Sequence, residues 1–404
     1  MTETILYDYW LASTEGIGLK TVMSLSQAGY TSKSIYELSD LQLDKLASEK
    51  LLTAQIAHTL KERHTLDLQK EYDKLLQKEI NVLFPWDCAY PSRLKRIPDP
   101  PLTLYVHGTL PPQDTLSVAI VGARCCSSYG SYVAKELGST LAAEGISVVS
   151  GMASGIDGIS QQSAHDAGGN VFAVLGCGVD VCYPPRNRPL YDALWDAQNC
   201  GIMSEYLPGT KSKASLFPPR NRIISGLSDV VVVIEAKLKS GTLITVDMAL
   251  EQGKEVYALP GRITDRLSDG CNRLLRDGAR PLLSPKLFLS ELKEDILPLV
   301  KQRANAETAS PDMRSASVFP PPHMSKRSVY HDYNELAQKQ SVIPASFSET
   351  QSIIYQSLEQ TPITMEALCA RTGIFDLSVL LFELTTMQLQ GYVSQSGNLV
   401  CRTQ

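Results

Sequence analysis

Apolar positions between residues 80 and 300 gather into short, nearly uninterrupted runs that alternate with stretches of helical spacing. In the first such stretch, Val133, Leu137 and Leu141 recur every four residues, which is typical of one face of a helix. Six strand-sized runs follow one another along the chain, at 116–122, 146–150, 170–176, 202–206, 229–236 and 254–261. Strands that are apolar throughout lie in a parallel sheet covered on both faces. The sequence therefore predicts an α/β fold, with a Rossmann-like doubly wound parallel sheet over residues 80–300.

The two ends of the chain follow other patterns. Residues 1–75 have helical spacing and a Gly-Ile-Gly turn, which predicts a small helical module of the SAM or helix-hairpin-helix type. Residues 301–346 are rich in Ser, Pro, Ala and Gln, a composition that indicates a linker. In residues 347–404, a capping box of Ser348 and Gln351, two further helices and a hairpin at Gly397 follow in the order of a winged helix.

Positive charge is concentrated in a few places, although the chain carries 38 basic and 43 acidic residues and a formal net charge of -5. Every basic or glycine-rich cluster of the core comes directly after a predicted strand. The carboxyl ends of parallel strands meet at one edge of the sheet, and open α/β sheets bind their ligands there. We therefore expect a local basic crevice. Its cations are Arg124, Arg186, Arg188, Lys211, Lys213, Arg220, Arg222, Lys237 and Lys239.

The residue types at this edge suit a phosphate-bearing ligand. Ser127 begins the first helix of the core, where it either contacts a ligand or caps the helix. Phe217 offers a base a stacking face. Arg220 and Arg222 match phosphate with planar guanidinium groups, although pairing with surface acids is an alternative on spacing alone. Glycines that would let backbone amides approach a ligand stand at Gly122, Gly176 and Gly178.

Several function classes are disfavoured by what the motifs lack. The first glycine-rich turn is not GxGxxG, and no GxxxxGK[ST] sequence occurs, so neither a dinucleotide cofactor nor a P-loop is expected. Six scattered histidines and nine cysteines without CxxC spacing predict no metal site and no disulfide framework. Asp157 is expected to cap a helix, and no nucleophile–base pair stands out. With no apolar run near the roughly 20 residues that cross a bilayer, we expect a cytoplasmic protein without a membrane partner.

Several motifs follow one another along the core in a fixed order: VAIVGARCCSSYG, VVSGMASGIDGISQQSAH, GCGVDVCYPPRN, SEYLPG, FPPRNRIISGLSDVVVVIEA, SGTLITVDMALEQGKEVYALPG and GCNRLLRDGA. This order resembles one family, that of DNA-processing protein A (DprA/Smf). The resemblance implies a protein that binds single-stranded DNA without catalysis, protects incoming strands during natural transformation, loads the RecA recombinase and forms homodimers. By position, Arg124 matches the family's Gly-Ser-Arg arginine, with Ala123 replacing the serine, and Arg186 lies in its Tyr-Pro motif. The Phe-Pro-x-Arg-Asn-Arg motif is matched by Phe217, Arg220, Asn221 and Arg222.

Two other functions are weighed against this one. The segment from Arg220 to Thr242 also resembles nucleotide phosphoribohydrolases of the lysine-decarboxylase-like family, but Ile244 and Thr245 stand where their catalytic acid is expected. A transcription factor acting through the tail is disfavoured because residues 345–404 contain two basic and five acidic residues. The tail is therefore expected to contact proteins. In the core, Lys237 is one more predicted DNA contact, in addition to the residues named above.

Overall fold

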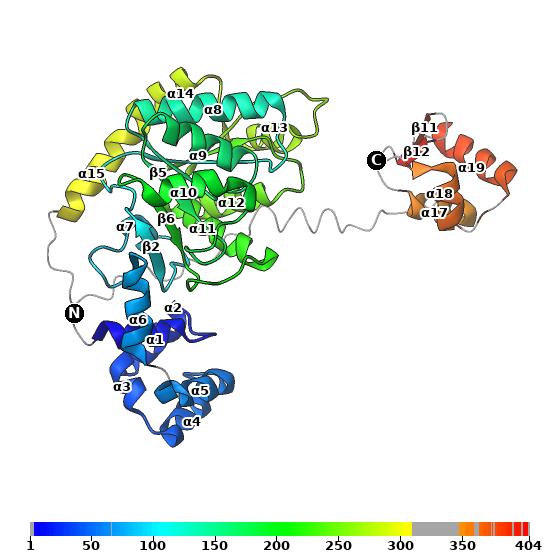
Figure 1. Ribbon diagram of the computed structural model, residues 1–404. Helices are drawn as coiled ribbons and strands as arrows, with labels where there is room; N and C mark the ends of the chain where they lie inside the picture. The colour runs from blue at the N-terminus through cyan, green and yellow to red at the C-terminus, as the bar shows by residue number, and fades with distance from the viewer. Residues whose placement is uncertain are drawn as a thin grey trace. The chain divides into compact units, whose positions relative to one another are not determined.

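The computed structural model describes residues 4–65 and 67–308, and in the tail residues 347–358, 363–372, 374, 376–389, 392–396 and 399–402. The chain divides into two compact units, Met1–Met324 and Ser325–Gln404 (Figure 1). Residues 301–308 of the predicted linker continue helix α15 (Leu297–Thr308) instead, and 309–346 lie outside the described residues. None of the helices in the described ranges is long and apolar enough to span a bilayer.

A nine-stranded sheet forms the centre of the first unit, in the order β1-β2-β6-β5-β4-β3-β7-β8-β9. The seven strands from β6 to β9 in this order are parallel, whereas β1 and β2 are antiparallel additions at one edge. The strands are β1 (Ile80–Leu83), β2 (Leu104–Gly108), β3 (Ser117–Gly122), β4 (Ser147–Ser150), β5 (Val171–Val174), β6 (Gly201–Ser204), β7 (Val230–Ile234), β8 (Glu255–Ala258) and β9 (Arg280–Pro281).

The six predicted strands are thus confirmed as β3 to β8, and the predicted parallel sheet is confirmed from β6 to β9, while two antiparallel strands add to its edge. Neither β1 nor β2 was expected. In β1, buried and more exposed positions alternate over only four residues, which is the pattern of an edge strand and too short to recognise. Contacts of the neighbouring strand β2 hold this edge of the sheet in place. His107 of β2 stacks on Trp195 with 3.5 Å between ring centres, which joins the strand to the helix that covers it.

Helices cover both faces of the parallel strands. Starting from β3, the chain proceeds to β4, β5 and β6 in one direction and then returns to add β7, β8 and β9 on the other side. Because such crossovers are right-handed, the helices of the two halves lie on opposite faces of the sheet. This reversal is the arrangement typical of doubly wound sheets. The helices of this part are α7 (Ser92–Lys95), α8 (Ser128–Ala143), α9 (Ile156–Asp166), α10 (Arg188–Asp196), α11 (Phe217–Leu227), α12 (Gly241–Glu251), α13 (Asp269–Arg276) and α14 (Pro285–Glu291).

Six helices precede the sheet and have a small apolar core of their own, which includes Leu25, Leu43 and Leu60. The core of the sheet nevertheless includes Tyr9 and Tyr72 from the first and last of these helices, whose rings lie 5.7 Å apart. The helices therefore pack on the sheet and do not stand apart from it. They are α1 (Thr4–Ser13), α2 (Leu19–Gln27), α3 (Ser32–Glu37), α4 (Asp40–Ser48), α5 (Ala54–Lys61) and α6 (Leu68–Gln77).

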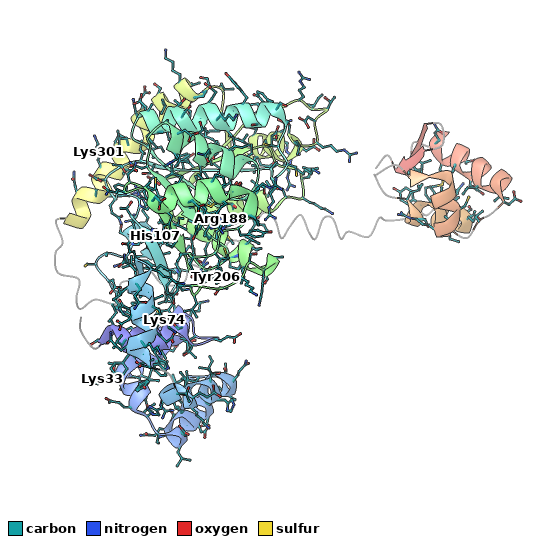
Figure 2. All side chains as sticks on the ribbon, viewed as in Figure 1. Lys33, Lys74, His107, Arg188, Tyr206 and Lys301 are labelled. Carbon is teal, nitrogen blue, oxygen red and sulfur yellow. The ribbon has the colours of Figure 1, made fainter. Side chains whose placement is uncertain are left out.

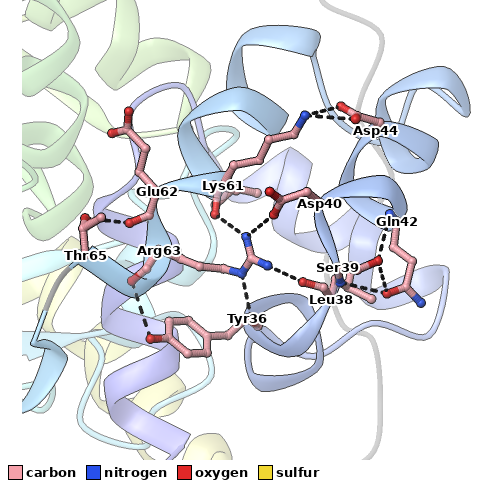
Figure 3. A network of polar contacts seen from close by, with 11 residues as sticks. Tyr36, Leu38, Ser39, Asp40, Gln42, Asp44, Lys61, Glu62, Arg63 and Thr65 are labelled. Carbon is pink, nitrogen blue, oxygen red and sulfur yellow. Dashed lines mark hydrogen bonds and ion pairs between the residues drawn. The ribbon is translucent and has the colours of Figure 1, made fainter.

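A buried arginine holds the loops of this helical part together (Figure 3). Arg63 donates hydrogen bonds to the carbonyl oxygens of Tyr36 (2.9 Å), Leu60 (3.0 Å) and Leu38, and it lies 3.1 Å from the carboxylate of Asp40. These carbonyl groups lie in the last turns of α3 and α5 and at the residue that follows α3, where a helix satisfies few of its carbonyl oxygens itself. Arg63 is therefore used internally and contributes no free charge to the surface.

A second set of charges, centred on the buried carboxylate of Asp229, lies at the amino-terminal ends of β3 and β7. The carboxylate of Asp229 accepts a hydrogen bond from the guanidinium of Arg93 and another from the amide of Ser117, both at 3.0 Å. The ammonium of Lys254 donates to Ser228 O at 2.6 Å, and Arg303 lies 3.8 Å from Asp229. Arg93 also donates to the carbonyl oxygens of the segment before β3. These charges connect four segments of the chain.

The second unit has its own core, which includes Ile354, Leu380 and Leu384. The predicted capping box is confirmed: the Ser348 hydroxyl accepts from the Gln351 amide, and the Gln351 side chain accepts from the Ser348 amide. The predicted hairpin residue Gly397 lies outside the described residues. Its strands have the order β10-β12-β11. Its elements are α17 (Glu349–Ser357), β10 (Ile363–Thr364), α18 (Met365–Thr372), α19 (Leu377–Leu389), β11 (Val393–Ser396) and β12 (Leu399–Arg402).

Candidate nucleic-acid interface

A cavity of about 680 Å³ opens at the carboxyl ends of β3 and β7. The loops that follow these adjacent strands lead to helices on opposite faces, so their ends diverge and leave a crevice at the edge of the sheet. Residues 122–125 line one side and residues 237–245 the other, with the start of α11 between them. The structure thus places the predicted crevice at the point where the strand order reverses.

Positively charged side chains dominate the rim of this first cavity. Arg124, Lys237, Lys239 and Arg266 are exposed, and within the described part of the chain none of the four forms an ion pair. Asp157 is the one acid among the described residues that line the cavity. Unpaired cations around a concave surface raise the local concentration of anions, in spite of the acidic total charge.

Phe217 forms an aromatic surface inside the cavity. Its half-buried ring packs over Gly176, whose missing Cβ leaves the space that the ring fills. The guanidinium groups of Arg124 and Arg220 lie 5.4 and 5.8 Å from the ring centre, within the range of cation–π attraction. Tyr183, which is 37% exposed, lies next to it with 5.4 Å between ring centres. Two adjacent aromatic rings beside unpaired cations suit stacking of bases.

Arg220 supports this surface from below and does not project from it. The side chain is only 4% exposed, and its guanidinium donates to Gly151 O at 2.8 Å and to Val174 O. Burial lowers the pKa of Arg220 and raises that of Asp157, each opposed by the charge of the other, and the guanidinium stays protonated. Arg220 therefore reaches the cavity as a buried positive charge, with Asn221 accepting from its Nε at 3.1 Å.

Arg222 does not belong to the cavity. Its guanidinium donates two hydrogen bonds to the carboxylate of Glu205, at 2.8 and 2.6 Å, and its Nε donates to Asp99 O at 2.8 Å. A paired, half-buried guanidinium has neither free charge nor free donors for a ligand. The prediction of a DNA contact at Arg222 is therefore wrong, and the alternative of pairing with acids is correct for this residue. Arg188 likewise faces the carboxylate of Asp192 at 3.4 Å.

Ser127 is also occupied by the protein itself. Its amide donates to the carboxylate of Glu235 at 2.8 Å, its hydroxyl donates to the same carboxylate, and that hydroxyl accepts from the Gly130 amide at 3.0 Å. Glu235 follows β7 with a φ of 57°, a left-handed conformation that costs a residue other than glycine about 1 kcal/mol. Ser127 is thus a helix cap, and the site where Rossmann-like proteins bind phosphate is filled by an internal carboxylate.

The structure also differs from the predictions for three glycines and for the helix cap expected at Asp157. Gly176 and Gly178 are buried, and the Gly178 amide donates to Thr210 O, so these amides do not reach a ligand. Gly122 lines the cavity, but its main role is close packing, since a Cβ there would overlap the backbone of β7. Asp157 is the second residue of α9, not its cap; Gly155 has that position, and Asp157 accepts from the Gly151 amide at 3.2 Å.

A second cavity, of about 730 Å³, adjoins the first. Arg124 and Cys125 line both, and Arg186 lines the second. The predicted contacts Arg124, Arg186 and Arg220 therefore face two connected hollows on one side of the molecule. Lys237 lines the first cavity, as predicted for the crevice, whereas Lys211 and Lys213 line neither of the two.

Sequence reasoning missed Arg266, which lines the first cavity, and Tyr183, whose ring lies next to that of Phe217. Arg266 stands in a loop that begins after β8, so its place after a strand could have found it. Tyr183 precedes a proline in the quoted motif GCGVDVCYPPRN, but nothing local indicates that its ring meets Phe217, 34 residues further on. Pairing of this kind depends on how the loops after β5 and β6 fold.

The fold and the site define a mixed α/β protein with a mostly parallel sheet and a cationic cavity at its topological switch point. The family model of DNA recombination-mediator protein A matches residues 81–293. The chain belongs to this family. DNA processing protein DprA of Streptococcus pneumoniae is 36% identical over 67% of this chain and 97% of its own length. Protein Smf of Synechocystis is 31% identical over 97% of both chains.

A solved structure agrees with the sequence comparison. The X-ray structure of DNA processing protein A from Streptococcus pneumoniae superposes with a TM-score of 0.60 and 34% identity. It covers 71% of this chain and 97% of that one. The likeness to a DNA-processing protein therefore extends through the sheet and its covering helices.

Proposed function

We propose that the protein binds single-stranded DNA in the cationic cavity without catalysing a reaction on it. The observation that carries this proposal is the combination of four unpaired cations at the rim with the Phe217 ring inside. Cations hold a phosphate backbone, and an exposed ring stacks on any base that is not already paired in a duplex. Binding of this type depends strongly on salt and little on base sequence.

The occupied start of α8 argues against a nucleotide cofactor. In a dinucleotide-binding protein, the helix after the first core strand presents its free amides to the pyrophosphate. Here the carboxylate of Glu235 bonds to Ser127 and would repel phosphate at that point. The remaining anion-binding capacity lies in side chains at the rim, which suits a polymer lying across the cavity better than a small cofactor enclosed by it.

The alternative is a phosphoribohydrolase-like enzyme of related fold. Ile244 and Thr245 line the cavity at the place where that family has its acid. The buried Asp157 is the nearest substitute, but its carboxylate is bonded to the Gly151 amide and lies beside Arg220. Incubation with nucleoside monophosphates tests this alternative, and release of free base would favour it over a purely binding role.

Within the cell we propose the narrower role that the family resemblance implies. The protein protects incoming single strands in the cytoplasm during natural transformation or recombination, loads the RecA recombinase onto them and works as a homodimer. The proposed modules are a SAM or helix-hairpin-helix-like part at 1–75, the DNA-binding core at 80–300, a linker that begins after α15 ends at Thr308 and reaches residue 346, and a winged-helix-like domain at 347–404. Membrane attachment is not part of this role.

Competition between single- and double-stranded oligonucleotides of mixed sequence tests the central proposal. We expect the purified protein to prefer the single strand, and Arg124→Ala to lower that affinity about tenfold and to flatten the salt slope by roughly 0.7. Lys301→Ala is the matched control, because Lys301 is an exposed cation on α15 (Figure 2) that lines neither the first nor the second cavity. Equal affinity for duplex and single strand, or an Arg124→Ala variant that behaves like Lys301→Ala, contradicts the proposal.

The tail is proposed to contact proteins and not DNA. Deleting residues 345–404, which carry two basic and five acidic residues, should leave the single-strand affinity unchanged within about twofold. A filter-binding titration of the shortened protein measures this. A large loss of affinity would instead assign strand binding to the tail.

A further inference from the structure

We infer that the bound strand does not end in the first cavity but crosses Arg124 and continues in the second, between α8, α9 and the start of α10. This inference rests on the proposed function and concerns the length of the site. The two cavities have similar volumes, about 680 and 730 Å³, and share Arg124 and Cys125 as common lining residues. A strand that leaves the Phe217 ring past Arg124 therefore enters the second cavity directly.

The second cavity supplies cations that are free to hold phosphates. Arg186 and Lys135 are exposed and line it, and neither has an ion pair with any residue that the structure describes. Arg188, two residues after Arg186, is instead paired with Asp192 at 3.4 Å. Lys135 lies on α8, in the stretch between the first two quoted motifs, and only the fold brings it to the same groove as Arg186.

Specific contacts fix both cations on the walls. Asn187 donates to Met152 O (2.8 Å) and Ala153 O (3.2 Å), and Gly158 leaves room for its amide group, so the turn that bears Arg186 is held against the start of α9. On the opposite wall, the Ser163 hydroxyl donates to the backbone oxygen of Lys135 at 2.8 Å, which ties α8 to α9. The groove between them is therefore part of the fold and not a gap between loose surface side chains.

One carboxylate marks the limit of the phosphate path. Asp166, near the end of α9, lines the second cavity and accepts a hydrogen bond from Gln162 at 2.8 Å. It would repel a phosphate, so the strand is held between Arg124 at one end of this groove and Asp166 at the other. The geometry thus adds Lys135 to the strand-binding residues.

The test measures how two remote lysines combine. Lys239 lines only the first cavity and Lys135 only the second. With an oligonucleotide of about 24 nucleotides, longer than common single-strand sites of roughly 4–16, each alanine variant should weaken binding about threefold. The losses should multiply to about tenfold in the double variant, because separate contacts to one strand are additive in free energy. Each substitution should also lower the salt slope by about 0.7.

Charge reversal and a length series sharpen the result. Lys135→Glu should weaken binding of the long strand more than Lys135→Ala, and both effects should shrink with an oligonucleotide of about 6 nucleotides, which fits in one cavity at a time. All variants change exposed side chains, and Lys301→Ala again serves as control. If Lys135→Ala and Lys135→Glu bind like the control while Lys239→Ala and Arg124→Ala are weakened, the second cavity is not part of the site. If the unmodified protein shows no preference for single strands, the proposed function itself fails.

Discussion

The two ends of the central sheet both gather cations, but they treat them differently. At the amino-terminal ends of β3 and β7, Arg93, Lys254 and Arg303 surround the carboxylate of Asp229, and Arg93 and Lys254 donate to backbone carbonyls. At the carboxyl-terminal ends, cations such as Arg124 point into a cavity without carboxylate partners in the described chain. The same residue types serve structure at one end and remain available at the other.

This difference shows that counting basic residues does not locate a binding site. A buried guanidinium must find its hydrogen-bond partners inside the protein, since leaving them unmade costs several kcal/mol. An exposed one keeps its partners in water and can exchange them for phosphate oxygens at little cost. The partners of each cation, and not its position in the sequence, therefore decide whether it stabilises the fold or binds a ligand.

The largest expected effect tests the structural end of the sheet, which is the amino-terminal ends of β3 and β7 where the cations surround Asp229. Arg93→Met should lower the free energy of unfolding by about 3–5 kcal/mol, because it leaves the carboxylate of Asp229 buried without its main partner. Urea unfolding measures the loss, and the single-strand affinity of the folded fraction should not change. Removing the stranded charge as well, in Arg93→Met with Asp229→Asn, should recover part of the stability. A loss below about 1 kcal/mol would mean that the pair behaves like an exposed one.

The next effect tests the binding end. Phe217→Ala should weaken single-strand binding by about 1–3 kcal/mol, the range for losing a stacked base. Anisotropy with a labelled oligonucleotide measures it, and Phe217→Trp should retain most of the affinity because it keeps a ring over Gly176. Tyr183→Ala distinguishes the contribution of the Tyr183 ring to binding from that of the Phe217 ring. If Tyr183→Ala loses binding while Phe217→Ala does not, the stacking surface is Tyr183.

The smallest effect concerns the pH dependence of stability at the structural end. Burial, opposed by Asp229, lowers the pKa of Lys254 from 10.5 to about 8. The unfolded chain therefore binds the proton of Lys254 more tightly than the folded chain does. The contribution of Lys254 to the free energy of unfolding thus increases as the pH rises from 8 to 10, and it is lost as the pH falls back through 8. After allowance for solvent screening, we expect about 1 kcal/mol. Urea unfolding at several pH values should show this rise in the unmodified protein and not in Lys254→Met; parallel curves would contradict it.

Much of the fold was visible in the sequence because its signals are local. The run from Val230 to Ile234 is apolar at every position, and β7 occupies it. The edge strand β2 was missed because antiparallel pairing with β6 leaves no such signature over five residues that end in His107 and Gly108. Parallel order also sufficed to place the candidate site at one edge of the sheet, since strand ends that follow one another in the sequence meet in space.

Which residues of that edge are available was not visible, because the deciding partners are remote. Glu205 neutralises Arg222 from 17 residues away, and Glu235 reaches Ser127 across 108 residues. Both acids were in view in the sequence, but neither has a periodic or motif relation to its partner. Sequence reasoning therefore predicted the edge of the sheet at which the candidate site lies, but it included residues whose side chains are bonded to other parts of the protein.

The carboxylate of Glu235 has a kinetic consequence. Because Glu235 accepts from the amide of the cap residue Ser127, and the Ser127 hydroxyl accepts from the Gly130 amide, affinity for a polyanion has to come from long side chains that move independently of the backbone. Contacts of this kind break one by one, each at small cost, so a strand held by them is open to gradual replacement by a second protein before it dissociates as a whole. A compact binding site made of several backbone amides would have prevented this gradual replacement.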